Sequence, residues 1–406
     1  MLQCGLLGRR LGHSFSPEIH ALLADYPYEL IELEPEALGE FLQSTPYDGL
    51  NVTIPYKKDV LAYCASLSPA AEAIGCVNTL VRRENGWHGD NTDYAGFAYM
   101  LDSLNVDIKG KKALVFGTGG ASLTVNKVLS DRGAGEIVHI SRFGENNYNN
   151  LSLHADAKVI INATPLGMYP NAGAAPASLE NFPLCEAVLD VVYNPSRTAL
   201  LLDAEKRGIP HVGGLGMLVA QAHAAAEIFL NKSLDRSIIC RIQKEIEKKT
   251  RNIILVGMPG SGKSKKGQLL AGKLGREFVD ADEYFTSCHG LSPAEAIKSL
   301  GEEKMREMET HVLKILGQRS GLVIATGGGC VTREENYPLL HQNGIIIWVK
   351  RPLEELPTKG RPLSQSCGVA ELYNRRAGLY EAFADVEIEV SSSVEEAVDA
   401  IMEAIK

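Results

Sequence analysis

Several features that mark whole classes of protein are scarce or missing in this chain. Its eight cysteines form no CxxC pair, which favours reduced thiols over a disulfide framework or a zinc site and predicts a cytoplasmic protein. Basic residues are also fewer than acidic ones, which gives a formal net charge of -9. A negative balance argues against a broad nucleic-acid surface, so we expect no nucleic-acid partner.

No apolar run is long enough to predict a membrane span. The longest, such as 215–226, are interrupted by Gly, Gln or His and fall short of the roughly 20 residues that a bilayer needs. The apolar stretch 1–7 is too short for a signal peptide and is followed directly by Arg9 and Arg10. What the chain does have is 406 residues with 45% apolar content, which predicts two or three globular domains.

Short β-branched runs alternate with amphipathic stretches along the whole chain, a pattern that predicts an α/β fold with mainly parallel sheets. Two of these runs lead directly into glycine-rich turns, at Gly117 and Gly257, so we expect two nucleotide-binding units. The runs that we predict as strands lie at 113–116, 137–140, 159–162, 253–256, 323–325 and 345–349.

The domain plan follows from these turns. We expect a substrate-binding α/β lobe at 1–108 and 213–240, a Rossmann lobe at 109–212, a linker at 241–250 and a P-loop domain with a parallel sheet at 251–406. The segment 213–231 is predicted to be helical and to pack back on the first lobe, leaving a cleft between the two lobes. The polar segment 237–250 predicts a helix that runs into the linker.

The first glycine turn reads GTGGAS at 117–122 and follows a predicted strand. Such a turn lets the backbone approach a pyrophosphate, which then lies at a helix N-terminus. Arg142 lies 22 residues after Gly120, at the end of the next predicted strand. A cation there suits the 2′-phosphate of NADP, although a solvated surface arginine is the alternative. The NADP-binding residues predicted in this turn and the next strand are Gly117, Thr118, Gly119, Gly120, Ala121 and Arg142.

Six blocks of the first half resemble the signatures of shikimate dehydrogenases, in that family's order over about residues 5–235. They are GHSFSPEIH at 12–20, NVTIPYK at 51–57, GCVNT at 75–79, GDNTDYAG at 89–96, NATPLGM at 162–168 and GMLVAQA at 216–222. The resemblance implies that Lys57 and Asp93 are the catalytic pair, an assignment that also suits the proton donor that a ketone reduction needs. It implies a substrate site at Ser14, Ser16, Thr53, Asn78, Tyr193 and Gln221, and adds Val191 and Gly214 to the NADP site.

Simpler alternatives exist for some of these residues. Asn51 and Thr53, beside Pro55, are typical of a turn. Asp93 is placed to cap a helix that begins at Tyr94.

The second glycine turn, GMPGSGKS at 257–264, satisfies the phosphate-loop pattern GxxxxGK[ST] and follows an apolar strand. Backbone N–H groups of such a loop hold phosphates, Lys263 reaches the outer phosphates and the Ser264 hydroxyl binds magnesium. No NKxD base-reading motif is present, which argues against a GTPase. The residues predicted to bind ATP here are Gly257, Gly260, Ser261, Gly262, Lys263 and Ser264.

The blocks that follow resemble shikimate kinase over about residues 252–405. They are FVDAD at 278–282, GEEKMREME at 301–309, ATGGG at 325–329, GRPL at 360–363 and RAGLY at 376–380. The resemblance implies that Asp282 binds the substrate hydroxyls and accepts the proton, and that Asp280 supports magnesium beside Ser264. It implies that Arg306, Gly328 and Arg376 bind the substrate carboxylate, and that Arg361 in the lid stabilises phosphate charge and contacts ATP. As alternatives, the two aspartates simply end a strand, and Arg306 forms an exposed ion pair with Glu302 or Glu309.

Together the two halves predict a bifunctional enzyme of the shikimate pathway that uses NADP(H), ATP and Mg2+. Its small-molecule substrates would be 3-dehydroshikimate and shikimate, and its oligomeric state, monomer or homodimer, stays open. One alternative is a quinate/shikimate dehydrogenase with a degradative role. Another is that the kinase half has become a nucleotide-sensing or scaffolding module, because its lid is short and only Lys359 is available as a second cation.

Overall fold

The computed structural model describes residues 2–12, 14–356, 368–389 and 393–405. The chain forms two compact units, Met1–Glu245 and Ile246–Lys406. The division falls inside one helix, α8 (Ser237–Thr250). The segment 241–250, which the sequence predicts as a linker, is therefore the second part of this helix. Within the described ranges, no helix is both long enough and apolar enough to cross a membrane.

The first lobe of the N-terminal unit is built on a six-stranded mixed sheet with the order β2-β1-β3-β5-β6-β4. Strands β1 and β3 are parallel, whereas β5 is antiparallel to both β3 and β6. Leu7, Leu50 and Leu80 form part of its core, all with no exposed surface. The strands are β1 (Cys4–Gly8), β2 (Tyr28–Glu32), β3 (Gly49–Val52), β4 (Cys64–Leu67), β5 (Thr79–Arg83) and β6 (Gly86–Asp90).

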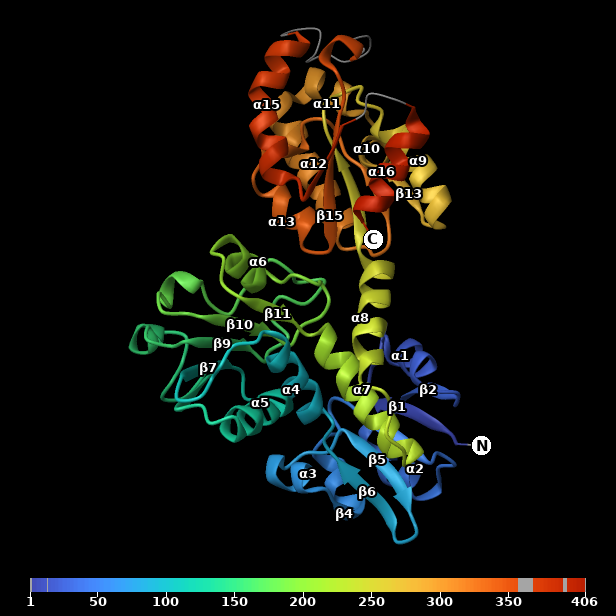
Figure 1. Ribbon diagram of the computed structural model, residues 1–406, viewed down its shortest axis with the longest axis vertical. Helices are drawn as coiled ribbons and strands as arrows, with labels where there is room; N and C mark the ends of the chain where they lie inside the picture. Colours follow the sequence, from blue (N-terminus) through green and yellow to red (C-terminus); the bar gives the residue numbers. More distant parts are fainter. Residues whose placement is uncertain (1, 13, 357–367, 390–392, 406) are drawn as a thin grey trace. The chain divides into compact units, whose positions relative to one another are not determined.

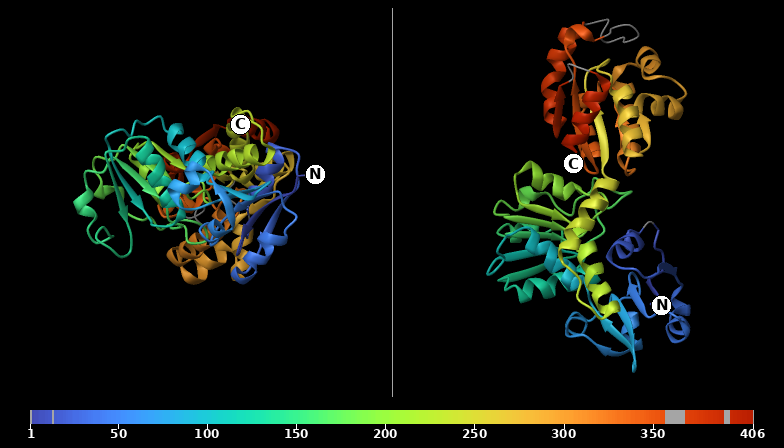
Figure 2. Two further views of the ribbon diagram at one scale, coloured as in Figure 1. Left: turned by 90° about the horizontal axis from the view of Figure 1, so that it is seen from below. Right: turned by 45° about the vertical axis from the view of Figure 1, so that its right-hand side comes forward.

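Among the described residues, the helices of this lobe include one that returns from much later in the chain (Figure 1, Figure 2). Phe229 near the end of α7 packs on β3, because a Cβ on Gly49 would lie 2.5 Å from its ring. The expectation that 213–231 folds back on the first lobe is thus confirmed. The helices are α1 (Ser16–Leu23), α2 (Leu38–Ser44), α3 (Pro69–Ile74), α4 (Asp93–Ser103) and α7 (Leu215–Leu230).

The second lobe of this unit is a five-stranded sheet with the order β11-β10-β9-β7-β8, in which all pairs are parallel. Its central strands carry Val, Ile and Leu and are buried on both faces, as expected for a parallel sheet covered by helices. The strands are β7 (Lys112–Phe116), β8 (Glu136–Ile140), β9 (Val159–Asn162), β10 (Ala187–Asp190) and β11 (His211–Gly213), with helices α5 (Gly120–Asp131) and α6 (Ala199–Lys206).

The C-terminal unit also contains a five-stranded parallel sheet, ordered β13-β14-β12-β15-β16. The six predicted strands of the two parallel sheets are confirmed, with ends within one residue of the prediction. The strands here are β12 (Asn252–Val256), β13 (Phe278–Asp280), β14 (Val323–Ala325), β15 (Gly344–Lys350) and β16 (Val386–Glu389). The helices are α9 (Lys263–Leu274), α10 (Ala281–His289), α11 (Pro293–Leu300), α12 (Glu302–Gly317), α13 (Asn336–His341), α15 (Val369–Phe383) and α16 (Val394–Ala404).

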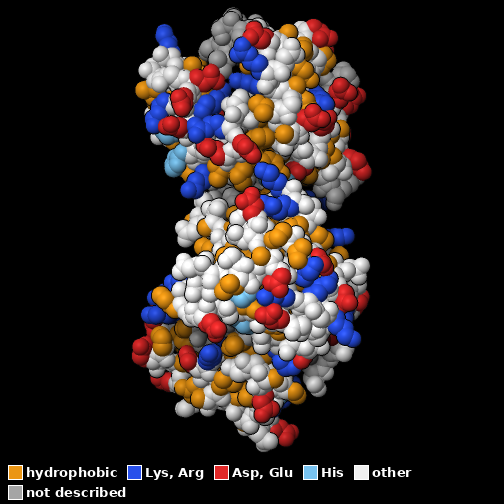
Figure 3. All heavy atoms as spheres, turned by 90° about the vertical axis from the view of Figure 1, so that its left-hand side faces the viewer, with side chains coloured by type: hydrophobic (Ala, Val, Ile, Leu, Met, Phe, Trp, Pro, Cys, Tyr) orange, Lys and Arg blue, Asp and Glu red, His pale blue; other side chains and the backbone are white. Residues whose placement is uncertain are grey.

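Charged side chains of both signs are interspersed over each unit on the face that Figure 3 shows. This distribution agrees with the excess of 50 acidic over 41 basic residues in the sequence. On this face, neither unit presents the broad basic surface that is typical of nucleic-acid binding.

Candidate active sites

The topology of the first sheet brings four distant segments to one edge. Strand β3 and its parallel neighbour β1 end there, and β5 begins there because it runs antiparallel to β3, with Thr79 opposite Asn51. Strand β6 runs antiparallel to β5 and so ends at the same edge, where Asp90 lies opposite Thr79. The segments that carry the predicted dehydrogenase residues therefore meet at this edge.

Lys57 and Asp93 form an ion pair at this edge, with Nζ 2.5 Å from Oδ2. Their side chains are 21% and 11% exposed, so the pair is largely withdrawn from water yet still reachable by solvent. Asp93 is the first residue of α4, and the N-cap position belongs to Thr92, which makes no side-chain capping bond. The capping alternative is thus wrong, since the Asp93 carboxylate is turned to Lys57.

Two buried asparagines, Asn51 and Asn78, lie at the same edge of the sheet. The Oδ1 atom of Asn78 accepts hydrogen bonds from the backbone N–H of Thr92 (2.7 Å) and the hydroxyl of Thr79 (3.0 Å). These contacts orient the amide, so its Nδ2 donor is the end available to a substrate oxygen. Asn51 lies within β3, not in a turn, and its Oδ1 accepts from the Tyr28 hydroxyl at 2.7 Å. Thr53 does open a turn, because the N–H of Tyr56 donates to its carbonyl.

The two serines predicted for the substrate carboxylate lie side by side after β1. The Ser14 hydroxyl donates to Oγ of Ser16 at 3.1 Å, and the Ser16 N–H donates back to Oγ of Ser14 at 3.2 Å. Ser16 is also the first residue of α1, where helix N–H groups have no partner within the helix. Two hydroxyls beside these donors suit an anion such as a carboxylate.

Two further predicted substrate residues come from elements outside the first sheet. Tyr193 follows β10 of the second lobe, yet its ring centroid lies 6.0 Å from that of Phe15 in the first lobe. Burial raises the pKa of Tyr193, so its hydroxyl stays protonated and able to donate. Gln221 lies on α7, and its Nε2 donates to the Leu218 carbonyl at 2.9 Å.

The glycine turn after β7 has the geometry that a dinucleotide needs. Gly117 has φ +111°, a conformation that favours glycine, and a Cβ on Gly119 would meet nothing within 4 Å. The helix α5 begins at Gly120, so its first N–H groups follow the turn directly. A Cβ on Gly214 would lie 2.0 Å from the Val191 carbonyl oxygen, which places these two predicted residues in backbone contact.

The glycine turn also lies close to the ion pair. A Cβ on Gly120 would be 3.8 Å from Cδ of Lys57, so the lysine predicted to be catalytic in one lobe borders the glycine turn of the other. Arg142 is exposed in the loop after β8, and its charge lowers the pKa of the nearby Tyr148 while burial raises it more strongly. An exposed arginine at this edge is accessible to a phosphate.

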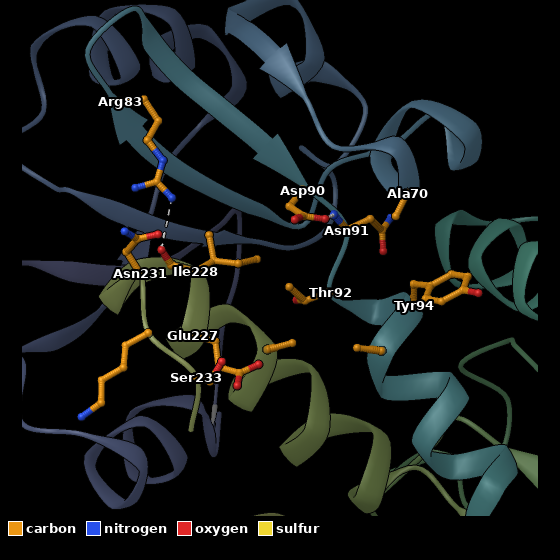
Figure 4. Close-up of a pocket in the computed structure, with 13 residues that line it drawn as sticks. Ala70, Arg83, Asp90, Asn91, Thr92, Tyr94, Glu227, Ile228, Asn231 and Ser233 are labelled. Atoms are coloured by element: carbon orange, nitrogen blue, oxygen red, sulfur yellow. Dashed lines mark hydrogen bonds between the residues drawn. The ribbon is translucent and has the colours of Figure 1, made fainter. Parts of the chain in front are cut away.

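A cavity of about 540 Å³ lies behind this edge in the first lobe (Figure 4). Asn91 and Thr92, the two residues before Asp93, line it from one side, and Glu227 and Ile228 of α7 line it from the other. Lys57 and Asp93 are not among its lining residues. The cavity is therefore separate from the Lys57–Asp93 ion pair, although the segment that leads into Asp93 forms part of its wall.

In the C-terminal unit, the parallel sheet gathers the predicted kinase residues at its carboxyl edge. The phosphate loop follows β12, Asp280 ends β13, and the glycines of 327–329 follow β14. Neighbouring strands in the order β13-β14-β12 place these three segments side by side. A crevice at the carboxyl ends of parallel strands is where such folds bind ligands.

The phosphate loop has the features that a magnesium–nucleotide site needs. Lys263 donates to the carbonyls of Gly257 (2.9 Å) and Met258 (3.1 Å), so its ammonium lies within the loop. The Ser264 hydroxyl donates to Oδ2 of Asp280 at 2.6 Å. A hydroxyl and a carboxylate in contact are oxygen ligands suited to Mg2+. Oδ1 of Asp280 meanwhile caps α10 by accepting two backbone N–H groups.

The Asp282 carboxyl group lies among other acids. A Cβ on Gly327 would be 2.8 Å from Oδ1 of Asp282 and 2.6 Å from Oε1 of Glu309, so the two carboxyl groups flank that glycine. Although Asp282 as a residue is exposed, desolvation of its carboxyl group, with the charges of Glu309 and Asp280, raises its pKa to about 6. A carboxylate with this pKa can accept a proton near neutral pH.

Two buried arginines meet at the glycines after β14. Arg306, 8% exposed, pairs with Glu309 at 2.8 Å and Glu302 at 3.2 Å, and its guanidinium lies against Gly329. The alternative prediction of an exposed ion pair is therefore wrong, because Arg306 is buried. Both acids named in that prediction do pair with Arg306. Arg376, 5% exposed, donates from Nη1 to the Gly328 carbonyl at 2.9 Å.

Both units of the chain are similar to known protein families. Residues 6–80 match the family model of the shikimate dehydrogenase substrate binding domain, and residues 259–406 match that of shikimate kinase. A shikimate dehydrogenase (NADP(+)) from Clostridium perfringens is 37% identical over 265 residues, which cover 60% of this chain and 97% of that protein. The chain belongs to the shikimate dehydrogenase family.

Solved structures of shikimate dehydrogenases resemble the N-terminal unit. A chorismate mutase/shikimate 5-dehydrogenase fusion protein from Clostridium acetobutylicum has 38% identity and a TM-score of 0.58, covering 61% of this chain and 98% of that one. Shikimate 5-dehydrogenase from Thermus thermophilus, in complex with NADP(H) and shikimate, has 31% identity and a TM-score of 0.55, covering 60% and 99%. With the kinase match at its C-terminus, the chain carries the two domains of a bifunctional shikimate-pathway enzyme.

Two residues of the kinase unit lie at this site although the sequence did not predict them there. Glu309 was expected only as a partner in an exposed ion pair, and Tyr380 had no predicted role. The Tyr380 hydroxyl donates to the Gly328 carbonyl, the same acceptor that Arg376 uses. Arg376 and Tyr380 are four residues apart on one helix, a spacing that places both on the same face and so indicates that Tyr380 lies beside Arg376. Arg361 and Lys359 lie outside the described residues.

Proposed function

We propose that the chain is a bifunctional cytoplasmic enzyme that reduces 3-dehydroshikimate to shikimate and then phosphorylates the 3-hydroxyl of shikimate. The observation that carries the first activity is the Lys57–Asp93 pair, 2.5 Å apart and next to the glycine turn. The second activity follows from a phosphate loop that shares an edge with Asp282 and two buried arginines. The product of one unit is the substrate of the other, which supports both assignments.

In the dehydrogenase unit, NADPH supplies the hydride for the ketone carbon. As that carbon accepts the hydride, the carbonyl oxygen gains negative charge, and the Lys57 ammonium donates a proton from Nζ to it. Asp93 holds the ammonium in position and stabilises its charge. Because the Lys57 side chain is 21% exposed, solvent returns the proton after turnover. The overall reaction consumes one NADPH and one proton for each shikimate formed.

The substrate is held by side chains from both lobes. Ser14 and Ser16 bind its carboxylate, while the ring hydroxyls are bound by Thr53, Asn78, Tyr193 and Gln221. A site with this many donors and acceptors rejects analogues that lack a hydroxyl, because buried polar groups would be left unpaired. We assign the cofactor site to Gly117, Thr118, Gly119, Gly120, Ala121, Arg142, Val191 and Gly214, with Arg142 binding the 2′-phosphate that distinguishes NADP from NAD.

In the kinase unit, MgATP supplies the phosphoryl group. Arg306, Arg376 and the Gly328 backbone bind the carboxylate of shikimate, because guanidinium groups suit that planar anion. Asp282 orients the ring hydroxyls and accepts the proton of the attacking one. Ser264 and Asp280 would hold the metal, and Gly257, Gly260, Ser261 and Gly262 form the loop that binds the phosphates together with Lys263. Arg361 is proposed to add positive charge from the lid.

We assign the substrate lobe to 1–108 and 213–240, the NADP lobe to 109–212 and the kinase to 251–406. The proposed partners are small molecules only. The decisive experiment gives the purified protein 3-dehydroshikimate, NADPH and MgATP together and identifies the products by mass spectrometry. We expect shikimate 3-phosphate. Accumulation of shikimate alone would refute the kinase assignment and favour a nucleotide-sensing module.

A second assay tests the cofactor and substrate choice. We expect oxidation of shikimate with NADP+ to be faster than oxidation of quinate with NAD+. The reverse preference would point to the degradative alternative. Arg142→Ala should weaken NADP+ binding by roughly tenfold, since a charged contact with the 2′-phosphate would be lost, while NAD+ binding should change little.

A further inference from the structure

The phosphate loop of the kinase unit is contacted by more cations than its sequence pattern requires. Besides Lys263, the loop carbonyls accept hydrogen bonds from Lys266 and Arg351. Lys266 lies one turn further along α9 and donates from Nζ to the Ser261 carbonyl at 2.7 Å. Arg351 follows β15 and donates from Nη1 to the Gly260 carbonyl at 3.3 Å. Three cations therefore approach this short loop.

The ammonium of Lys266 is buried beneath the loop. The residue is 4% exposed, and a Cβ on Gly262 would lie 2.7 Å from its Nζ. Its neighbour Lys265 is exposed. Among the residues that the structure describes, no carboxylate forms an ion pair with Lys266, whereas Arg351 pairs with Glu355. Burying an ammonium without a counter-ion is unfavourable, so this position favours an anion bound nearby.

The hydrogen bond of Lys266 also fixes the direction of one peptide group. In a trans peptide the C=O and the N–H point in opposite directions. The Ser261 carbonyl is directed to Lys266, so the N–H of Gly262 is directed away from it, on the other side of the loop. This is a donor that a phosphate loop uses to hold its ligand. The Ser261 N–H is already committed to the Met258 carbonyl at 3.1 Å.

Lys266 and Arg351 lie close enough to affect each other. They donate to adjacent loop carbonyls, Lys266 to that of Ser261 and Arg351 to that of Gly260. Two like charges that disfavour each other at a loop are stabilised when a polyanion binds between or beside them.

We propose that Lys266 is a positioning residue of the nucleotide site, which holds the Ser261–Gly262 peptide with its N–H toward the phosphates and adds positive charge beneath the loop. It acts on the nucleotide through the loop and not on the reacting hydroxyl. The inference rests on the proposed kinase function. Lys266 lies on α9, beyond the last residue of the phosphate-loop pattern, so the pattern alone does not predict its contribution to phosphate binding.

The test compares Lys266→Met with Lys265→Met in the full-length chain. Both changes remove one positive charge from the same helix, but only the first removes the contact with Ser261. For Lys266→Met we expect the KM for MgATP and the dissociation constant of MgADP to rise by roughly tenfold, the size of one lost charged hydrogen bond. The KM for shikimate should stay unchanged. Lys265→Met should match the wild type in all three.

Three results would overturn the proposal: equal effects of the two variants, an unchanged MgADP affinity in Lys266→Met, or a parallel rise in the KM for shikimate. If Lys266→Met does not fold, Lys266→Leu is used, which also removes both the donor and the charge, and wild-type MgADP affinity in that variant would also overturn the proposal. A wild-type chain that binds MgADP but forms no shikimate 3-phosphate would instead refute the kinase function, while the MgADP comparison would still decide the role of Lys266.

Discussion

The guanidinium of Arg306 lies directly against the Cα of Gly329, so that a Cβ at that glycine would be 2.0 Å from Nη2. This guanidinium is the far end of a long side chain, but it has little freedom to move. Arg306 is 8% exposed, and Glu302 and Glu309 hold two of its nitrogens. Glycine at 329 is therefore what allows the buried arginine to reach the edge of the sheet.

This contact predicts a selective defect in Gly329→Ala. The added methyl group should displace Arg306 and raise the KM for shikimate by at least roughly tenfold, because a charged hydrogen bond to the carboxylate is weakened. The affinity for MgADP should be unchanged. Gly272→Ala is the control, since a Cβ there meets nothing within 4 Å. An equal shikimate KM in the two variants would contradict the contact as the cause.

The ion pair of the dehydrogenase unit predicts a loss confined to one activity. Lys57→Met should lower the rate of 3-dehydroshikimate reduction by about 10²–10⁴-fold, the usual contribution of a positioned proton donor. Asp93→Asn should also lower it, because the ammonium loses its 2.5 Å partner. Lys58→Met, a change at the exposed neighbour, serves as the control. Phosphorylation of added shikimate by the same preparations reports whether the protein is intact.

The raised pKa of Asp282 predicts the pH at which kinase activity falls on the acidic side of its pH profile, its acid limb. The carboxylate is the form that accepts a proton, and its pKa is raised to about 6 by desolvation and by Glu309 and Asp280. The kinase kcat/KM should therefore fall as the pH drops through about 6. In Asp282→Asn the residual activity should lose this limb. A wild-type profile that stays flat down to about pH 5 would exclude Asp282 as the base.

Asp190 predicts a pH-dependent stability of the N-terminal unit. It has no exposed surface, and burial raises its pKa from 3.8 to about 6, although Thr198, Val192 and Asn162 donate hydrogen bonds to it. The folded state therefore holds a proton that the unfolded state releases between about pH 4 and pH 6. Stability should fall as the pH rises through this window, by roughly 3 kcal/mol at most.

Thermal unfolding of the wild type and Asp190→Asn at about pH 5 and pH 8 checks this sign. An amide does not ionise, so the variant should lose less stability than the wild type between the two pH values. Because every other titrating group is common to both proteins, the difference isolates Asp190. A variant with the same or a greater loss would contradict the prediction.

Much of the fold was readable from local patterns. The parallel strands are short runs of β-branched residues, and their predicted ends lie within one residue of the observed ones. The two glycine turns were recognisable because a strand, a glycine-rich turn and a helix are consecutive in sequence. The segment 241–250 was predicted as a linker because it is polar, but polarity does not distinguish an exposed helix from a loop, and it forms the end of α8.

The residue types of both sites and their order can be read from the amino-acid sequence, because motifs such as NVTIPYK and GMPGSGKS are contiguous. Which distant residues meet depends instead on strand pairing and strand order. The antiparallel pairing of β5 brings Asn78 beside the ends of β1 and β3, and strand order does the same for Asp282 and the glycines after β14. Burial also depends on the tertiary fold. Positions 265 and 266 are both lysine, but on helix α9 Lys265 is exposed to solvent and Lys266 is buried under the phosphate loop.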